Sequence, residues 1–76
     1  MQKEEFITNF ANQFDETEAS EITFNTVFKD LDEWSSLTTL SIIAMCDEVY
    51  GVKITGDDLK KSKTVEDLYK LILNRK

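Results

Sequence analysis

The fold of this 76-residue chain is decided by the stretch Trp34-Ser35-Ser36-Leu37-Thr38-Thr39-Leu40-Ser41-Ile42-Ile43-Ala44-Met45-Cys46-Asp47-Glu48-Val49-Tyr50, which Gly51 follows. A serine hydroxyl at a helix start accepts a hydrogen bond from a free N–H group of the first turn. Glycine readily adopts the left-handed backbone conformation that ends many helices. We therefore expect a helix that one of the paired serines caps and that ends at Gly51.

At the helical repeat, the apolar residues of this helix fall on two sides. The side assigned to the core holds Ile42, Ile43, Cys46, Val49 and Tyr50. The opposite side, which includes Ser36, is expected to face water and holds Leu37, Leu40, Ser41, Ala44, Asp47 and Glu48. Because a small domain rarely exposes two neighbouring leucines without a partner for them, the pattern predicts a docking face.

Three further helices are expected around this one. Apolar residues at helical spacing predict a first helix from Lys3 to about Phe14, with a core stripe of Phe6, Ile7, Phe10, Ala11 and Phe14. Thr55, with Asp58 three residues later, predicts a short third helix that turns Leu59 inward and carries Lys60, Lys61 and Lys63 near its C-terminal end. Thr64 and Asp67 predict a last helix to about Asn74, with core residues Val65, Leu68, Tyr69, Leu71 and Ile72.

A long connection separates the first helix from Trp34. It begins with Asp15 to Glu21, which has no apolar period, and loops of this length need an explanation. Widely spaced apolar residues predict that it contains one short helical turn and is pinned to the bundle by Phe24, Val27, Phe28 and Leu31. Trp34 is expected to pack against the helix that follows it. The expected fold is all-α, a small four-helix bundle of three longer helices and one short helix, forming one domain over residues 1–76.

Composition limits the classes of partner. Fifteen acidic and nine basic residues give a formal net charge of −6, and the chain has no histidine. Nucleic-acid binding is excluded because it depends on Lys and Arg, whereas protein partners with basic patches are favoured. No stretch is long enough to span a bilayer, and the first residues are not typical of a leader segment. We expect a soluble, cytoplasmic monomer with no membrane partner.

The side chains also limit the chemistry. Without histidine, Ser36 has no base of its own, so a serine hydrolase is excluded and the chain is not expected to be an enzyme. A single cysteine cannot form an internal disulfide, and we expect Cys46 to be buried and inert. Asp30 and Asp32 do not begin a calcium loop, because that loop needs glycine and glutamate where Ser35 and Ser41 stand. No metal site is predicted.

Motifs along the whole chain resemble the acyl carrier protein family. They are Phe28-x-Asp30-Leu31-x-x-Trp34-Ser35-Ser36-Leu37, then Asp47-Glu48-Val49-Tyr50-Gly51-Val52-Lys53-Ile54, and finally Thr64-Val65-Glu66-Asp67-Leu68. The family's motif is Asp-Ser-Leu at the start of its second helix. Ser36 and Leu37 match it, whereas Ser35 stands where the family usually has aspartate. Because serine also caps helices well, this difference leaves the fold unaffected and concerns recognition by the modifying transferase.

The resemblance implies a carrier that separate enzymes act on. Ser36 would carry 4′-phosphopantetheine, supplied from coenzyme A by a phosphopantetheinyl transferase, while Ser35 caps the helix. Further partners would be acyl-transferring and chain-elongating enzymes with basic patches, which dock on the face of Leu37, Leu40, Ser41, Ala44, Asp47 and Glu48. An acyl chain from fatty-acid, lipid or polyketide-type biosynthesis would insert past Ile42, Ile43, Cys46 and Leu59. Two alternatives stay open: an aminoacyl or peptidyl carrier of a specialised pathway, and an unmodified helical interaction module.

Overall fold

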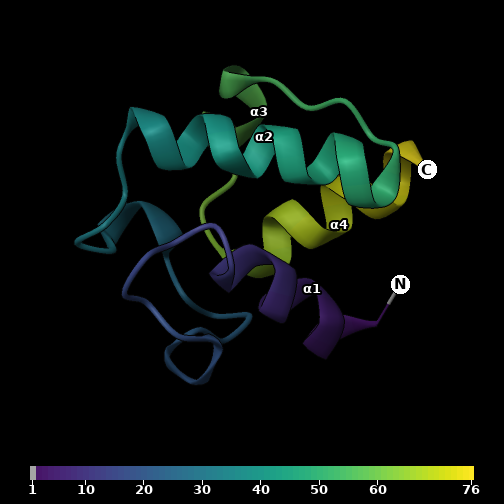
Figure 1. Ribbon diagram of the computed structural model, residues 1–76. Helices are drawn as coiled ribbons and strands as arrows, with labels where there is room; N and C mark the ends of the chain where they lie inside the picture. The colour runs from purple at the N-terminus through teal and green to yellow at the C-terminus, as the bar shows by residue number, and fades with distance from the viewer. Residues whose placement is uncertain (1) are drawn as a thin grey trace.

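The computed structural model describes residues 2–76. Its elements are the α-helices α1 (Lys3–Ala11), α2 (Ser36–Tyr50), α3 (Gly56–Lys61) and α4 (Val65–Arg75), and the 3-10 helices η1 (Ala19–Glu21) and η2 (Phe28–Asp30). No strand occurs within these residues. In Figure 1, α2 lies above α1 and α4, and the long connection between α1 and α2 forms the left side of the molecule. The prediction of an all-α four-helix bundle with one short helix is confirmed.

Both predicted ends of the central helix are confirmed. The Ser35 hydroxyl accepts a hydrogen bond from the Thr38 N–H at 3.3 Å, which satisfies one free donor of the first turn. Gly51 ends α2 in the left-handed conformation, with φ at 67°. A side chain at this position would strain the backbone, so glycine ends the helix at low cost.

The core is formed by apolar side chains from all four helices. Phe6 and Phe10 of α1 are fully buried, and the rings of Phe6 and of Tyr69 on α4 pack edge to face with 5.5 Å between their centroids. Asn9 donates a hydrogen bond to the Tyr50 hydroxyl at 2.9 Å, which links α1 to the end of α2. Each large apolar side chain buried in this way stabilises the fold by about 1.5–3 kcal/mol. Packing of this core therefore holds α2 in place against α1.

The predicted core face of α2 is wrong at one residue and misses another. Val49 is 50% exposed, whereas Met45 is buried together with Thr38, Ile42 and Cys46. Helical spacing alone assigns Val49 to the buried side, but burial also requires a neighbouring element. In the last turn of α2, Phe6 and Asn9 of α1 contact Tyr50 instead.

The first helix is shorter than predicted. It ends at Ala11, because the N–H groups of Gln13 and Phe14 donate to the carbonyls of Phe10 and Ala11, three residues back. This tighter pattern is typical of a helix end. Phe14 nevertheless remains buried, so its apolar character reflects a place in the core and not continuation of the helix.

The connection between α1 and α2 contains two 3-10 helices, where one helical turn was predicted. η2 corresponds to the predicted turn and buries Phe28, whose ring centroid lies 4.9 Å from that of Trp34. η1 was missed because it depends on polar capping, in which the side chains of Glu18 and Glu21 accept hydrogen bonds reciprocally from the backbone. The N–H of Val65 also donates to the Thr26 carbonyl at 3.1 Å. The connection is thereby fixed to the start of α4.

The capping predicted for the two C-terminal helices is confirmed. Thr55 and Thr64 each accept a hydrogen bond from the N–H three residues later, at Asp58 and Asp67. The Asp58 carboxylate has a second role, because both terminal nitrogens of the Arg75 guanidinium donate to it, at 2.6 and 2.8 Å. Hydrogen bonds from Arg75 lower the pKa of Asp58 to about 2. This ion pair ties the start of α3 to the end of α4.

Within residues 2–76, no helix combines the length and the apolar character that crossing a membrane requires.

Candidate functional site

The site begins at Ser36, the first residue of α2. Its side chain is exposed, and its hydroxyl has no hydrogen-bond partner among residues 2–76. The N–H groups of Ser36 and Leu37 likewise have no acceptor within the described chain. Free N–H groups and the helix dipole favour a negative charge at this position by roughly 0.3–1 kcal/mol. The position therefore suits a serine that becomes a phosphodiester.

The backbone just before Ser36 is held by two residues that sequence reasoning did not include in the site. Thr38 is buried, and its hydroxyl donates to the Glu33 carbonyl at 2.8 Å. The Glu33 carboxylate accepts hydrogen bonds from the N–H groups of Asp15, Glu16 and Thr17 and from the Thr17 hydroxyl. These bonds, led by the one from the Thr17 hydroxyl, lower the pKa of Glu33. The long connection is thus anchored directly beside the start of α2.

The two residues differ in how far sequence could have revealed them. Thr38 stands three residues after the cap Ser35, which is the spacing of a capping box. Glu33 has no comparable local signal, because its partner Thr17 lies 16 residues away in the chain.

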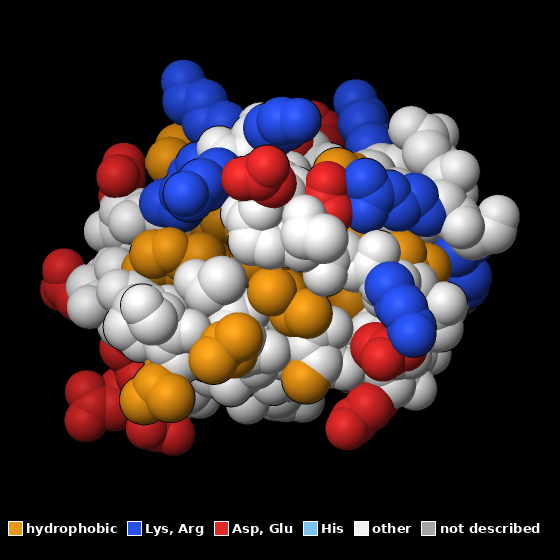
Figure 2. All heavy atoms as spheres, turned by 90° about the horizontal axis from the view of Figure 1, so that it is seen from above, with side chains coloured by type: hydrophobic (Ala, Val, Ile, Leu, Met, Phe, Trp, Pro, Cys, Tyr) orange, Lys and Arg blue, Asp and Glu red, His pale blue; other side chains and the backbone are white. Residues whose placement is uncertain are grey.

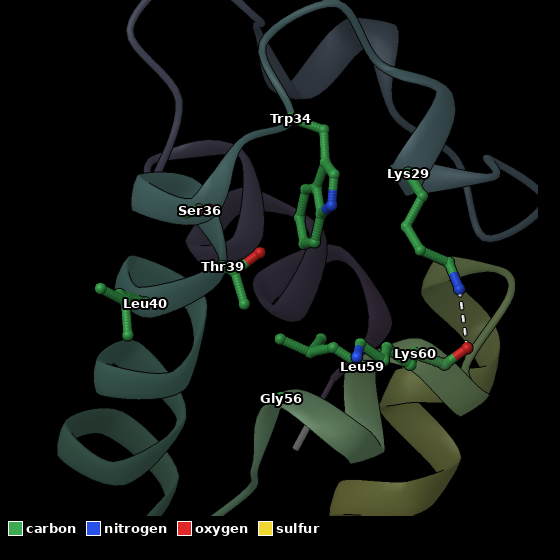
Figure 3. Close-up of a pocket in the computed structure, with 8 residues that line it drawn as sticks. All are labelled: Lys29, Trp34, Ser36, Thr39, Leu40, Gly56, Leu59 and Lys60. Atoms are coloured by element: carbon green, nitrogen blue, oxygen red, sulfur yellow. Dashed lines mark hydrogen bonds between the residues drawn. The ribbon is translucent and has the colours of Figure 1, made fainter.

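A pocket of about 390 Å³ lies beside Ser36 and is lined by Lys29, Trp34, Ser36, Thr39, Leu40, Gly56, Leu59 and Lys60. Figure 3 shows the side chains of Trp34 and Leu59 converging on the space between α2 and α3. On the side away from α2, the Lys29 ammonium donates to the Lys60 carbonyl at 2.8 Å. The pocket therefore has apolar walls next to Ser36 and two lysines at its margin.

The four residues predicted to contact an acyl chain occupy different depths. Leu59 lines the pocket, Ile42 and Cys46 are fully buried in the core, and Ile43 is partly buried. Burial raises the pKa of the Cys46 thiol to about 12, so the thiol is protonated at neutral pH and a poor nucleophile. No group of three or more His, Cys, Asp or Glu side chains is arranged to hold a metal ion in residues 2–76.

The residues predicted to bind partners lie along α2 on the side opposite the core. Leu37 and Leu40 are 77% and 63% exposed. Ala44, Asp47 and Glu48 are exposed as well. Ser41 is partly buried and lines a second hollow of about 310 Å³, which Ser35, Leu37 and Thr38 also border. Seen from above α2, apolar side chains form a band across the middle of this face (Figure 2).

Comparison with known proteins agrees with this arrangement. Neither the curated proteins nor the solved structures contain a significant match to the chain. Residues 5–72 match the family model described as "Phosphopantetheine attachment site". The match covers all four helices except the start of α1 and the end of α4. Domains of this kind are generally carriers and not catalysts. The chain therefore belongs to the phosphopantetheine attachment site family, as an acyl carrier protein-type domain that binds 4′-phosphopantetheine covalently.

Proposed function

We propose that Ser36 carries the phosphopantetheine arm and that the chain holds acyl groups as thioesters on it. The observation that carries this proposal is the exposed, unbonded Ser36 hydroxyl at the first residue of α2, within the matched family region. Ser35 is less suited, because its hydroxyl is engaged as the helix cap. With no histidine in the chain, the transferase must supply the base that takes the proton from the Ser36 hydroxyl.

The pocket beside Ser36 supports an acyl cargo. Its walls include Trp34, Leu40 and Leu59, and burying a chain there would recover about 0.8 kcal/mol for each CH₂ removed from water. An acyl chain longer than the pocket would pass Leu59 toward Ile42, Ile43 and Cys46, which requires α2 and α3 to separate. Fatty-acid, lipid or polyketide-type biosynthesis supplies cargo of this kind. An aminoacyl or peptidyl group would gain less from such walls.

The exposed side of α2 supports docking by partner enzymes. Leu37 and Leu40 would contact an apolar surface of the partner, next to the arm on Ser36. Asp47 and Glu48 would steer a basic patch toward the C-terminal half of the helix, since exposed charges act mainly on the rate of association. Ser41 and Ala44 lie between these two groups. The partners would be the phosphopantetheinyl transferase and enzymes that transfer or extend acyl groups.

Co-expression with a broad-specificity phosphopantetheinyl transferase, followed by intact mass measurement, tests the attachment. The wild-type chain should gain the mass of one phosphopantetheine arm. Ser36→Ala should gain nothing, whereas Ser35→Ala, the matched control, should still be modified because the hydroxyl of Ser36 remains. Modification of Ser36→Ala would move the attachment to another residue. A wild-type chain that no transferase modifies would favour the unmodified interaction module.

A further inference from the structure

Four of the nine basic residues of the chain gather at one edge, although the chain is acidic as a whole. This lysine edge consists of Lys29 on η2, Lys60 and Lys61 in the last turn of α3, and Lys63 just after it. Two contacts bring η2 to this place: Lys29 donates to the Lys60 carbonyl, and the Thr26 carbonyl accepts the N–H of Val65. The lysines are therefore close in space although 31 residues separate Lys29 from Lys60.

The four lysines of the edge are exposed residues, and none forms an ion pair within residues 2–76. In residues 2–76, the ion pair of Arg75 with Asp58 is the only one within 4.0 Å. Acidic residues adjoin the lysine edge: Asp30 follows Lys29, Asp57 lies one helical turn before Lys60 and Lys61 on α3, and Asp67 accepts the N–H of Lys63 at 3.0 Å. None of these carboxylates lies within 4.0 Å of a lysine ammonium. The four lysines thus remain without a carboxylate partner in the described chain, on a molecule with a net charge of −6.

This positive edge adjoins the attachment serine. Lys29 and Lys60 line the same pocket as Ser36 (Figure 3). Seen from above α2, Lys and Arg side chains gather along one margin of the face, with Asp and Glu side chains among them (Figure 2). Asp47 and Glu48 lie at the other end of α2 from Ser36. The surface beside η2 and α3 therefore offers lysines without carboxylate partners, whereas the C-terminal half of α2 offers Asp47 and Glu48.

We propose that the enzyme acting on the arm presents an acidic surface to the lysine edge and a basic one to Asp47 and Glu48. The proposal rests on the proposed function, because the arm on Ser36 is what brings the enzyme to this surface. Complementary charges of both signs favour one orientation of the complex and penalise the reversed one. An acidic partner surface is the counterpart that fits four lysines without a carboxylate partner. This partner differs from one that recognises the carrier by its net negative charge alone.

The test uses the enzyme that acylates the holo protein, purified from source cells by that activity. Its kcat/KM for the holo protein is measured at low and high salt. Lys61→Glu with Lys63→Glu should lower kcat/KM about tenfold at low salt, and the loss should shrink as salt screens the charges. The matched control, Lys3→Glu with Lys70→Glu on α1 and α4, changes the net charge equally and should stay within about twofold. Asp47→Lys with Glu48→Lys should also lower kcat/KM, by removing the negative half of the surface.

Further measurements separate this proposal from its competitors. Intact mass before each assay shows whether the arm is attached, so failure of the proposed function is detected independently. Helicity and melting temperature check folding, and the neutral pair Lys61→Gln with Lys63→Gln should give an intermediate loss. Carbodiimide coupling should link lysines of the edge to Asp or Glu of the enzyme. Equal losses in the edge and control variants would overturn the proposal. So would lysine-dependent dimerisation, or binding to phosphatidylglycerol vesicles, in place of the enzyme effect.

Discussion

Ser35 and Ser36 are the same residue type but have different environments. Ser35 lies just before the helix, and Ser36 is its first residue. Ser35 has extended backbone angles, which turn its hydroxyl toward the Thr38 N–H, whereas Ser36 already belongs to the helix. Ser35→Ala should lower the free energy of unfolding of the apo protein by about 1 kcal/mol. Ser36→Ala should change it by less than about 0.5 kcal/mol, because its exposed hydroxyl makes no hydrogen bond that would be lost. Urea unfolding followed by circular dichroism measures both values.

A third variant serves as the control for the cap. Ser35→Asp also places a capping oxygen at this position, so its stability should be close to that of the wild type. Equal stability of the wild type and Ser35→Ala would contradict the role of Ser35 as a cap.

Cys46 is the residue whose chemistry is most changed by its surroundings. The side chain is fully buried on the core side of α2, and burial raises the pKa of its thiol to about 12. Native apo protein should therefore not react with a thiol reagent at neutral pH, and one thiol should appear on denaturation. Native holo protein should show one reactive thiol, that of the arm. Rapid labelling of native apo protein, counted by mass, would show that the core opens around Cys46.

At the scale of the elements, α3 depends on contacts outside itself. It has only six residues, which is too short for stability as an isolated helix. Its start is held to α4 by the Asp58–Arg75 ion pair, and Arg75 also donates to the Lys53 carbonyl at 3.3 Å. Because α3 carries Leu59 and Lys60 of the pocket, this tie fixes one wall of the pocket relative to α2.

The Asp58–Arg75 ion pair predicts a specific dependence of stability on pH. The Asp58 pKa is about 2 in the folded state, below its ordinary value of 3.8, so the unfolded chain binds this proton first on acidification. The stabilisation is therefore complete above about pH 4 and is lost as the pH falls toward about 2. Arg75→Gln should melt at a lower temperature than the wild type at neutral pH and should lose less stability over this acidic range.

Melting curves between neutral pH and pH 2 measure this difference for both proteins. Lys53→Gln is the control, because it removes a cation that has no carboxylate within 4.0 Å and leaves the backbone carbonyl that accepts from Arg75 in place. Its melting temperature should fall with decreasing pH in parallel with that of the wild type. Parallel curves for Arg75→Gln and the wild type would show that the ion pair does not contribute to acid stability.

At the scale of the whole molecule, the bundle is small enough for a bound chain to matter. A 76-residue domain has a modest core and a low stability, so a ligand that binds only the folded state raises the melting temperature measurably. The holo protein carrying a medium-length acyl chain should melt higher than the holo protein alone, and the signals of the Ile42 and Leu59 methyl groups should shift. Ser36→Ala incubated with the free fatty acid is the control and should show neither effect.

The opposite outcome would identify a different cargo. Equal melting temperatures and unshifted methyl signals would mean that the chain stays in water. That result would favour an aminoacyl or peptidyl carrier, whose polar cargo gains nothing from apolar walls.

The sequence by itself determined the elements whose causes lie within a few residues. Ser35, Thr55 and Thr64 each satisfy an N–H three positions later, and Gly51 ends α2 by its own backbone freedom. Such local hydrogen bonds are encoded by adjacent residue types, so the four helices and the cap Ser35 were predictable. The match of Ser36 and Leu37 to a family motif is equally local.

Only the tertiary structure decided what depends on residues distant in the chain. Packing decides which residues become neighbours. It leaves Val49 exposed, brings Glu33 to residues 15–17 and forms the lysine edge. Residue spacing specifies the direction of a side chain from its helix, but not which element covers it there. Burial and charge clustering are properties of the folded structure, because both depend on distances in space and not on positions in the sequence.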